Sequence, residues 1–561
     1  SLQLLEGGGT PSLQTPDFLG AVRALAASQF IDAELAQGMT HAYEFLRTLE
    51  NRLQALTARQ THRLPTQPAQ VERLAQLMGF ESVREFEHFR IEQQAWVHAQ
   101  FSDLFLERSG LRELSNKQQS IEWPPTDLLH ASLVEREVDT SSAEVIANAL
   151  TGLHQRLSKK PLSAEGRARL ERLMPLFIET LTRQRDPTAG LNDLIALIET
   201  IARRSAYLAL MYERPEILDH VIQVFGASEK VAQWIIQAPQ LLDDLIDPAH
   251  YTTLPSPPVI DAQDPEQALN SVARWRQTRF LKTALAELSQ SVDAPTAGKA
   301  LSDVAQTCIQ NILESIEQSP PLAVIAYGNL GARSLHYASD LDCVFLHAQG
   351  EVESEVVRIA QRLITLMQLP LPGGRLFEID TRLRPNGRAG LLVSHIDRFS
   401  SYQEDQAWLW EHQALIRARW IAGDQDLACR FETIRQEVLA QARDPKETAQ
   451  TLWNMRQKQT SGRSESPIKK RLTDIQFVGE WAVLTQAHQN VALLDARATQ
   501  DQRELAEGLP PSVSLGLQAS FSELTNALHH QWLSRDPEPL KDEMIKPMDT
   551  LIAEAWQTIQ S

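Results

Sequence analysis

Apolar residues recur at helix spacing along most of the chain, which predicts a mostly α-helical protein. In residues 16–62 they return every three or four positions, and a second stretch of this kind runs over 69–110. From 141 to 318 nearly every segment keeps the same period, interrupted by prolines. The pattern therefore predicts two helical regions, 1–110 and 141–318.

Between these regions, residues 111–140 do not keep the helix period. They contain polar residues and a Pro-Pro pair, so we expect a linker. Ser141 and Glu144 have the spacing of a capping box, in which each side chain accepts a backbone N–H bond at a helix start. We therefore expect the next helix to begin at Ser141.

The pattern changes between residues 319 and 425. Leu322–Tyr327 and Leu341–His347 are short apolar runs typical of buried strands, and Leu376–Arg382 alternates apolar and polar positions as a third strand does. Residues 353–368 form an amphipathic helical pattern between them. We therefore predict a small α/β domain at 319–425.

After this domain the helix period returns, which predicts a C-terminal helical bundle at 426–561. A polar loop is expected within it at 459–471. The composition supports long helices, because 561 residues contain only 24 glycines and 29 prolines. The length is sufficient for three or four domains.

The formal charge of −18 repels phosphate backbones, so we do not expect a nucleic acid partner. The three cysteines show neither paired zinc spacing nor a disulfide framework, which favours a reducing, cytoplasmic location. No apolar run approaches the roughly 20 residues that span a bilayer, so no membrane partner is expected. The chain starts with Ser1 and shows no signal peptide pattern, and we expect it to be cut from a longer protein.

The most informative stretch joins the first two predicted strands. Gly328 and Gly331 form a turn that permits positive φ and close approach of backbone N–H groups to an anion. Asp340 and Asp342 lie two residues apart on an extended chain and therefore point to the same face. Two carboxylates this close repel each other unless a cation lies between them, and oxygen ligands of this kind suit Mg²⁺ or Mn²⁺.

The third predicted strand supplies a further carboxylate. Asp380 would face the first pair and complete a site for two metals roughly 3.5–4 Å apart, as phosphoryl and nucleotidyl transfer require. Arg382 and Arg384 follow and would bind triphosphate oxygens. An isolated Asp-x-Asp is more often a solvated strand end, but the glycine turn before it and the Asp-bearing strand after it favour the site.

This set of residues resembles the polymerase-β-type nucleotidyltransferase superfamily. The chain resembles bacterial glutamine synthetase adenylyltransferase still more closely. The resemblance covers essentially the whole chain, and five stretches carry it: Gly8–Gln14, Leu46–Asn51, Tyr327–Leu346, Gly374–Gly387 and Ala407–Arg419.

The resemblance implies that residues 1–110 are the helical tail of that family's N-terminal half and that the rest is its adenylylating half. The expected fold is mostly α, with one embedded polymerase-β-like nucleotidyltransferase domain between helical bundles. The implied reaction transfers AMP from ATP to a tyrosine of glutamine synthetase, with the PII signalling protein as effector. Only one glycine-turn Asp-x-Asp centre is present, so only AMP addition is implied, not its removal.

The expected site residues follow from the residues and from the resemblance together. Asp340, Asp342 and Asp380 are the catalytic and metal-binding candidates, with Asp380 taking the tyrosine proton. The nucleotide-binding candidates are Gly328, Gly331, Ser339, Arg382 and Arg384.

Three positions depart from the family pattern, which has Lys at Asn329, Gly at Ala332 and Glu at Gln476. The basic triplet Lys469–Arg471 also replaces a Gly-Gly pair, and we expect it in a solvated loop rather than as an anion contact. These changes predict a slow enzyme. They also leave open a rival function, an inactive paralogue or fragment that binds glutamine synthetase or PII.

Other residues near the motifs have a structural interpretation and a functional one. We expect His336 and His347 to be structural. Trp408 and Trp410 are expected to pack in a core rather than stack on adenine. Glu411 would orient neighbours or lie on the helix surface. Arg417 and Arg419 remain possible triphosphate contacts.

Overall fold

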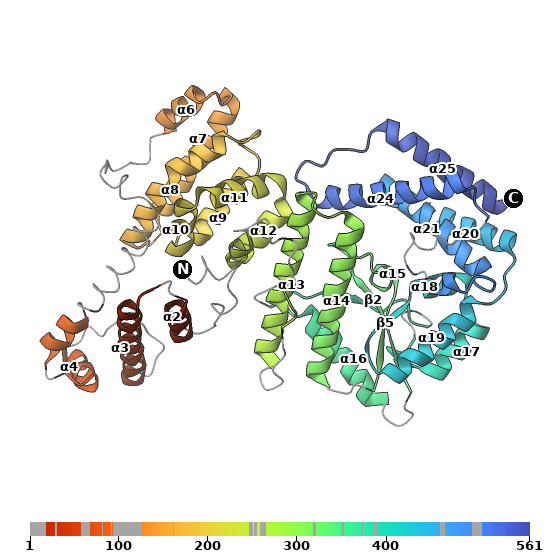
Figure 1. Ribbon diagram of the computed structural model, residues 1–561, viewed down its shortest axis with the longest axis horizontal. Coiled ribbons are helices and arrows are strands. Elements are labelled where there is room, and N and C mark those ends of the chain that lie inside the picture. Colours follow the sequence, from red (N-terminus) through yellow and green to blue (C-terminus); the bar gives the residue numbers. More distant parts are fainter. Residues whose placement is uncertain are drawn as a thin grey trace. The chain divides into compact units, whose positions relative to one another are not determined.

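Helices form most of the described chain, and its strands lie between Ala323 and Gly423 (Figure 1). The computed structural model describes residues 18–28, 31–57, 68–80, 82–90, 93, 126–160, 162–245, 251, 255–258, 265–317, 321–348, 353–371, 374–385, 387, 390–460, 466–495, 497 and 508–561. The family-like stretch Gly8–Gln14 and the first half of the predicted linker lie outside these residues. Contacts divide the chain into two compact units.

Unit 1 groups residues 1–124 with 163–175 and 204–215. Its helices are α2 (Phe18–Ala27), α3 (Ala33–Thr57), α4 (Pro68–Leu77), the first turns of α8 (Ala164–Thr182), and α10 (Ser205–Glu213). The helical stretch predicted over 69–110 is interrupted at Gly79, which has a φ of +86°. Phe80 N–H donates to the Ala75 carbonyl at 3.0 Å, so α4 ends in a Schellman motif that requires this glycine conformation.

Unit 2 begins with helices, and the first of them corrects the sequence prediction. These helices are α6 (Thr126–Glu135), α7 (Thr140–Ser158), α9 (Leu191–Ile201), α11 (Pro215–Ala227), α12 (Glu229–Gln237), the 3₁₀ helix η3 (Pro239–Leu245), α13 (Pro265–Leu288) and α14 (Ala294–Ile316). The predicted linker over 111–140 therefore contains a helix, α6. Its Leu129 and Leu133, four residues apart, are both buried, and this packing stabilises the helix.

The predicted capping box at Ser141 is wrong by two residues. Asp139 is the N-cap of α7 and accepts the backbone N–H of Ser142 at 3.0 Å. The Ser141 hydroxyl donates to the same carboxylate at 2.9 Å. The charged carboxylate of Asp139 is the stronger hydrogen-bond acceptor at the positive end of the helix, so Asp139 is the N-cap. Ser141 donates a hydrogen bond to this carboxylate and does not cap the helix itself.

The sheet has the order β3-β2-β1-β5, and β4 also pairs with β2. Its elements are β1 (Ala323–Ala326), the short helix α15 (Gly328–Gly331), β2 (Leu341–His347), α16 (Glu353–Gln368), β3 (Ile379–Asp380), β4 (Val393–His395), α17 (Ile396–Asp405), α18 (Leu409–Ile416) and β5 (Arg419–Gly423). β1 runs antiparallel to β2 and β5, whereas β3 and β4 run parallel to β2. The strand predicted over 376–382 is thus only two residues long.

Both faces of this sheet are covered, which explains why its strands are continuously apolar. Ala323 and Ile325 of β1 and Val344 and Leu346 of β2 belong to a core shared with the C-terminal helices. Side chains at the alternate positions point to the opposite face. Figure 1 shows α14 and α16 on one side of the strands and α17 to α19 on the other.

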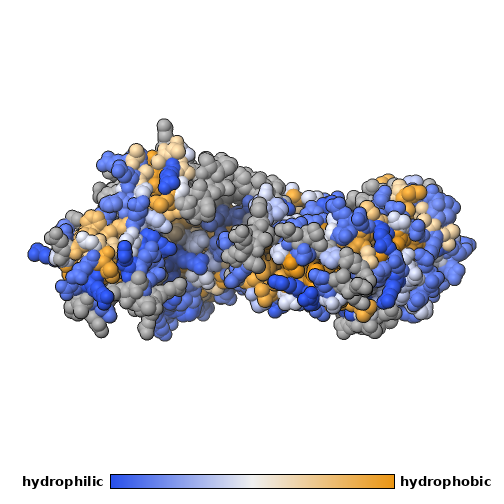
Figure 2. Space-filling view, turned by 90° about the horizontal axis from the view of Figure 1, so that it is seen from below, coloured by the Kyte–Doolittle hydropathy of each residue, from blue (hydrophilic) through white to orange (hydrophobic). Residues whose placement is uncertain are grey.

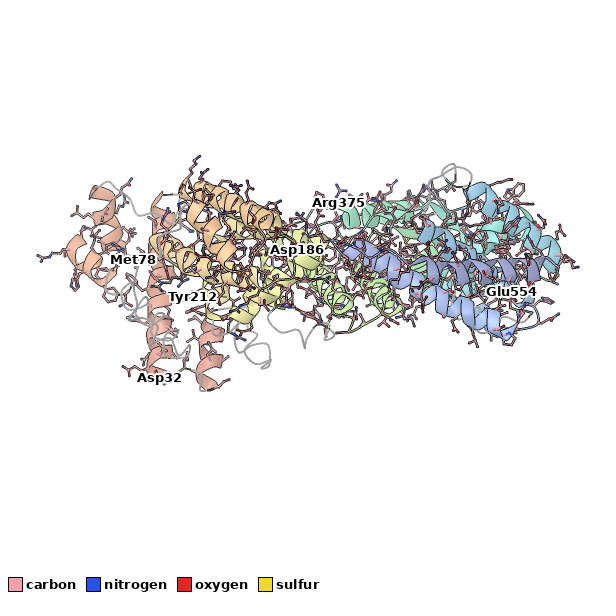
Figure 3. The ribbon with its side chains drawn as sticks, turned by 90° about the horizontal axis from the view of Figure 1, so that it is seen from above. Asp32, Met78, Asp186, Tyr212, Arg375 and Glu554 are labelled. Atoms are coloured by element: carbon pink, nitrogen blue, oxygen red, sulfur yellow. The ribbon has the colours of Figure 1, made fainter. Side chains whose placement is uncertain are left out.

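The C-terminal helices are α19 (Gln425–Leu439), α20 (Pro445–Thr460), α21 (Pro467–Gln486), α22 (Ala492–Asp495), α24 (Pro511–Leu533) and α25 (Asp542–Gln560). The polar loop predicted at 459–471 is too long, because α21 begins at Pro467 after the N-cap Ser466. In α25, Ile552 and Trp556 are buried, whereas Glu554, labelled in Figure 3, belongs to the exposed face.

The described surface is mixed in character. Figure 2 shows hydrophilic residues over much of the visible face, with smaller hydrophobic areas between them. None of the described helices combines the length and the apolar character that membrane crossing needs. The three cysteines are free thiols, and only Cys429 is exposed.

Candidate active site

The two predicted glycines lie where the chain has no room for a side chain. Gly328 has a φ of +55°, and a Cβ placed on it would come within 2.5 Å of the Asp342 carboxylate. A Cβ on Gly331 would come within 2.1 Å of the Arg417 carbonyl oxygen. Tyr327 N–H donates to the Asp342 carbonyl at 2.8 Å and fixes the start of the turn. The turn therefore brings glycine backbone directly against Asp342.

Ala332, one of the departures from the family pattern, fits this turn without strain. Its φ of −76° lies in the ordinary helical region, so glycine is not required there. Arg333, which follows it, takes the unusual φ of +54°. Its guanidinium donates to both carboxylate oxygens of Asp303 at 2.6 and 2.8 Å, an ion pair between α14 and the turn.

The sheet register brings two of the three candidate carboxylates together. Asp342 on β2 is paired with Asp380 on the parallel strand β3. Leu341 N–H donates to the Glu378 carbonyl at 2.9 Å and holds the two strands at this point. Paired residues on neighbouring strands point to the same face, so both carboxylates lie on one side of the sheet.

The electrostatics of Asp342 show how closely these groups interact. Burial raises the pKa of Asp342 to about 6, and the negative charges of Asp380 and Asp340 contribute to this increase. Arg382 opposes it. A carboxyl group that binds its proton this tightly is one that a cation would stabilise in the ionised form.

Arg382 forms hydrogen bonds and an ion pair with the Asp380 carboxylate in this structure. Its backbone N–H donates to Asp380 Oδ1 at 2.9 Å and its Nε donates to Oδ2 at 2.6 Å. The side chain of Arg382 is 60% exposed, whereas that of Asp380 is 13% exposed. Within the described part of the chain, no three His, Cys, Asp or Glu side chains are arranged to hold a metal ion. The donor set fits a divalent cation chemically, but Asp380 must first be released from Arg382.

Two other predicted nucleotide-binding residues organise loops. The Ser339 hydroxyl accepts the His336 N–H at 3.1 Å, across the turn before Asp340. Arg384 donates to the Thr381 carbonyl at 2.7 Å and to the Gly390 carbonyl at 3.2 Å, which holds the segment after β3. Ser339 directly precedes Asp340 in the chain and Arg384 is bonded to Thr381, which follows Asp380, and their role toward a nucleotide stays a prediction.

A buried polar network behind the turn was not predicted from the sequence. Arg417 donates to Asn329 Oδ1 at 3.4 Å, and its Nε lies 3.3 Å from Glu480 Oε1. Gln413 and Gln476 donate to the two oxygens of Glu480 at 2.6 and 2.7 Å. The Arg417 and Glu480 side chains are only 7% and 2% exposed. Asn329 and Gln476, which both depart from the family pattern, therefore belong to one network.

The spacing of this network is visible in the sequence only after the fold is known. Gln413 and Arg417 are four residues apart, as are Gln476 and Glu480, so each pair lies on one helix face. Nothing in the sequence indicates that α18 and α21 meet. Arg419 is also engaged, because it donates to Gln306 at 2.7 Å and to the Gly331 carbonyl at 3.3 Å. Both arginines thus have structural partners.

The predictions for Trp408 and Trp410 are wrong, and of the two alternatives for Glu411 the structure agrees with an orienting role and not with a place on the helix surface. Trp408 is 72% exposed and Trp410 is 44% exposed, so neither packs in a core. Glu411 is buried, and it accepts the Trp408 N–H at 2.9 Å and the Tyr402 hydroxyl at 2.8 Å. The Glu411 carboxylate therefore caps the start of α18.

The two histidines have structural surroundings. His336 Nδ1 accepts the Ala338 N–H at 3.2 Å, and burial together with His529 lowers the pKa of His336 to about 3. A histidine with so low a pKa is neutral at pH 7. His347 is buried at the end of β2, where its ring lies 5.2 Å from that of His395.

The basic triplet is helical rather than part of a solvated loop. Lys469, Lys470 and Arg471 lie in the first two turns of α21. Arg471 donates to both oxygens of Asp549 on α25, at 2.7 and 2.8 Å. This ion pair gives Arg471 a structural role between two helices.

Comparison with known proteins gives two family matches and a similar protein. Residues 218–434, which contain all eight candidate site residues, match a family model described as glutamate–ammonia ligase adenylyltransferase. Residues 10–105 match a second model, described as GlnD PII-uridylyltransferase. A bifunctional glutamine synthetase adenylyltransferase/adenylyl-removing enzyme from Nitrosococcus oceani is 34% identical over 548 residues, covering 88% of the chain. The chain spans 57% of the length of that relative.

Proposed function

Because the chain belongs to the glutamate–ammonia ligase adenylyltransferase family, we propose that it transfers AMP from ATP to a tyrosine hydroxyl of glutamine synthetase. Pyrophosphate is the second product. The observation that carries this proposal is the pairing of Asp342 with Asp380 directly behind the Gly328 turn. A pair of carboxylates beside a glycine turn suits the charge distribution of nucleotidyl transfer.

In this proposal Asp340, Asp342 and Asp380 hold Mg²⁺ or Mn²⁺. When bound, the metal would offset the negative charge of the triphosphate and of the leaving pyrophosphate. The raised pKa of Asp342 supports the assignment, because a carboxyl group that is buried and has Asp380 and Asp340 as negative neighbours is stabilised in its charged form by a cation. Arg382, which is exposed and has a long side chain, would leave Asp380 and bind phosphate oxygens, with Gly328, Gly331, Ser339 and Arg384 around the nucleotide.

The proposed transfer forms a bond between the tyrosine oxygen and the α-phosphorus of ATP. The bond from that phosphorus to the bridging oxygen breaks, and pyrophosphate leaves with the electron pair. A free tyrosine has a pKa of about 10, so its proton must be accepted near the transition state. Asp380 is the proposed acceptor, because its strand position places the carboxylate beside Asp342.

We also propose the PII signalling protein as an effector. The family resemblance supports this, and so does the match of residues 10–105 to a model named for a PII-uridylyltransferase. The partner protein and the effector are proposals for this chain, because it spans only 57% of its relative.

The proposal is tested by incubating the chain with glutamine synthetase, Mg²⁺ or Mn²⁺, and ATP labelled at the α-phosphate. We expect label on glutamine synthetase, and none when Asp342→Asn replaces the wild type. Glu378→Gln is the matched control, because Glu378 is exposed two residues before Asp380 and has no assigned role. ATP binding without any transfer would instead favour the binding-module function.

A further inference from the structure

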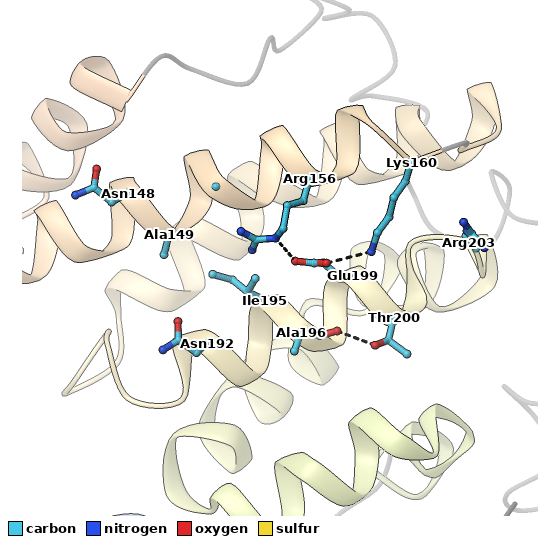
Figure 4. A pocket seen from close by; sticks show the side chains of 11 residues that line it. Asn148, Ala149, Arg156, Lys160, Asn192, Ile195, Ala196, Glu199, Thr200 and Arg203 are labelled. Carbon is cyan, nitrogen blue, oxygen red and sulfur yellow. Dashed lines mark hydrogen bonds and ion pairs between the residues drawn. The ribbon is translucent and has the colours of Figure 1, made fainter.

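Helices α7 and α9 of unit 2 enclose an open groove outside the nucleotidyltransferase sheet (Figure 4). Its volume is about 780 Å³. Gly152 and Ala196 contribute to its lining, and their small side chains leave space between the helices. Asn148 and Asn192 lie toward one end in Figure 4, and Lys160 and Arg203 lie toward the other.

Three cationic side chains and one carboxylate line this groove. Arg156 Nε donates to Glu199 Oε1 at 2.6 Å, and Lys160 Nζ donates to Glu199 Oε2 at 3.0 Å. Arg203 lines the same groove and, among the described residues, forms no ion pair. The groove therefore has a formal charge of +2, although the whole chain carries −18.

Glu199 holds its two partners in position. Burial acts to raise the pKa of Glu199, but the hydrogen bonds from Arg156 and Lys160 outweigh it and lower the pKa. A Cβ on Gly152 would lie 3.1 Å from Arg156 Nη1, so the guanidinium lies close over the α7 backbone at this glycine. The bond to Glu199 uses Nε and therefore does not occupy the Nη donors of Arg156.

We propose that this groove binds a small ligand that carries at least two phosphate or carboxylate groups. Guanidinium and ammonium donors fixed by a shared carboxylate are suited to such oxyanions. The surplus of two positive charges matches a ligand of charge −2 or more negative. The asparagine amides supply neutral hydrogen-bonding groups for the rest of the ligand, whereas the Thr200 hydroxyl donates to the Ala196 carbonyl at 2.8 Å.

The size and lining of the groove favour a small molecule over a protein segment. A volume of this order is typical of sites for ligands of nucleotide size. A docked helix would need apolar anchors, and Ile195 is the one large apolar side chain in the lining. α7 and α9 lie outside residues 319–425, so the site is distinct from the acidic centre and does not depend on the proposed transfer.

The test is calorimetric titration of the whole, metal-free chain with inorganic pyrophosphate and, separately, with citrate. The two probes distinguish a phosphate ligand from a carboxylate ligand. We expect at least one to bind, and we expect Arg156→Ala or Arg203→Ala to weaken that binding at least about tenfold. Raising the salt concentration should weaken it as well.

Lys159→Ala and Arg204→Ala are matched controls, because each removes an exposed cation next to a groove residue without touching the lining. Both should bind as the wild type does. Asn192→Asp adds a negative charge at an exposed lining position and leaves the Glu199 contacts intact, so it should weaken binding even if an arginine variant folds poorly. The proposal is overturned if neither probe binds, or if the groove variants bind a probe as tightly as the wild type does. If neither probe binds and a polyglutamate peptide does, the groove binds an acidic protein segment and the proposal is also overturned.

Discussion

Asp342 and Asp380 are register partners on the parallel strands β2 and β3. β3 is only two residues long, so almost its entire contribution to the sheet is to place Asp380 beside Asp342. The resulting repulsion contributes to the raised pKa of Asp342, and Gly328 provides the space that its carboxylate occupies. The local structure therefore concentrates negative charge at one point, which is favourable only if a cation or a proton is present.

The first prediction concerns this acidic centre. Asp340→Asn or Asp342→Asn should reduce AMP transfer at least about a hundredfold while the protein remains folded, because each removes a charge that holds the metal. The measurement is the initial rate of transfer, with circular dichroism as the check on folding. Glu378→Gln should keep the wild-type rate. Normal transfer by either Asp variant would contradict the metal assignment.

The second prediction concerns the ion pair between Arg382 and Asp380. Arg382→Ala removes a cation that competes with metal for the Asp380 carboxylate, so Mn²⁺ should bind the nucleotide-free protein about two- to fivefold more tightly. The affinity for ATP should fall about tenfold, since one charge-assisted contact to phosphate is lost. Both affinities can be measured by calorimetry.

The control for this variant is Arg375→Ala, which removes an exposed arginine shortly before β3 (Figure 3). Arg375→Ala should change neither affinity. If Arg382→Ala weakened Mn²⁺ binding instead, Arg382 would support the metal site rather than compete with it, and the proposed release of Asp380 would be wrong.

The third prediction follows from the network that joins Asn329 to Gln476. Gln476→Glu alone places a second carboxylate beside buried Glu480 and should lower the free energy of unfolding by about 1–2 kcal/mol. Asn329→Lys alone should also lower it, because it removes the Oδ1 atom that accepts from Arg417 and places a second cation beside that guanidinium; the exposure of residue 329 keeps this effect the smaller of the two. In the double variant the two introduced side chains have opposite charges, so we expect a favourable coupling of about 0.5–1 kcal/mol.

The same double variant should transfer AMP at least about tenfold faster than the wild type, because the lysine introduced by Asn329→Lys would add a phosphate contact. Chemical denaturation measures the coupling, and the transfer assay measures the rate. A double variant that is no faster than a measurable wild type would show that these positions do not limit the reaction. No transfer by either protein would favour the binding-module function.

The fourth prediction concerns pH and stability at Asp243 in η3. Burial, and then the charge of Asp244, raises the pKa of Asp243 to about 6. Lys282 lies 3.7 Å from Asp244, and Asp243 Oδ1 has no hydrogen-bond partner among the described residues. The folded state therefore holds this proton more tightly than the unfolded state, whose pKa is near 3.8.

The contribution of Asp243 to the free energy of unfolding should consequently fall as the pH rises from about 4 to about 6, and level off above that. Asp243→Asn removes this loss, so the variant should gain about 1–2 kcal/mol over the wild type at pH 7 and nothing at pH 4. Urea denaturation at the two pH values measures the difference. An equal effect of the substitution at both values would contradict the raised pKa.

Much of this architecture follows from local sequence. The strands around 322–327 and 341–347 are apolar because both faces of the sheet are covered, and α16 has the bounds that its amphipathic pattern predicts, 353–368. The two glycines could be picked out as a turn from the sequence, and the structure gives the reason for each: a Cβ would meet the Asp342 carboxylate at Gly328 and the Arg417 carbonyl oxygen at Gly331. That Asp340 and Asp342 share a face stays a prediction from strand geometry, because β2 begins at Leu341.

What could not be predicted depends on contacts between distant segments. The pairing of Arg417 with Glu480 requires α18 and α21 to meet, and no sequence spacing encodes that. Trp408 is expected in a core because large aromatic residues are usually buried, yet it stands at the start of α18 with its backbone N–H bonded to Glu411 and its side chain exposed. The cap of α7 was misplaced because Asp139 and Ser141 are both suitable, and only the backbone geometry decides between them.

The fifth prediction concerns the direction of the reaction. With a single glycine-turn Asp-x-Asp centre, the chain should add AMP and should not remove it in the presence of phosphate and uridylylated PII. Adenylylated glutamine synthetase, incubated under those conditions, should keep its AMP. Efficient phosphate-dependent removal would show that the acidic centre belongs to the opposite activity.

The central claim is that this chain attaches AMP to glutamine synthetase through the centre formed by Asp342 and Asp380. Peptide mass spectrometry of glutamine synthetase after incubation with the chain, ATP and Mg²⁺ tests it most directly. We predict AMP on a tyrosine with the wild-type chain and an unmodified tyrosine with Asp342→Asn. An unmodified protein with the wild type, or equal modification with both chains, would contradict the claim.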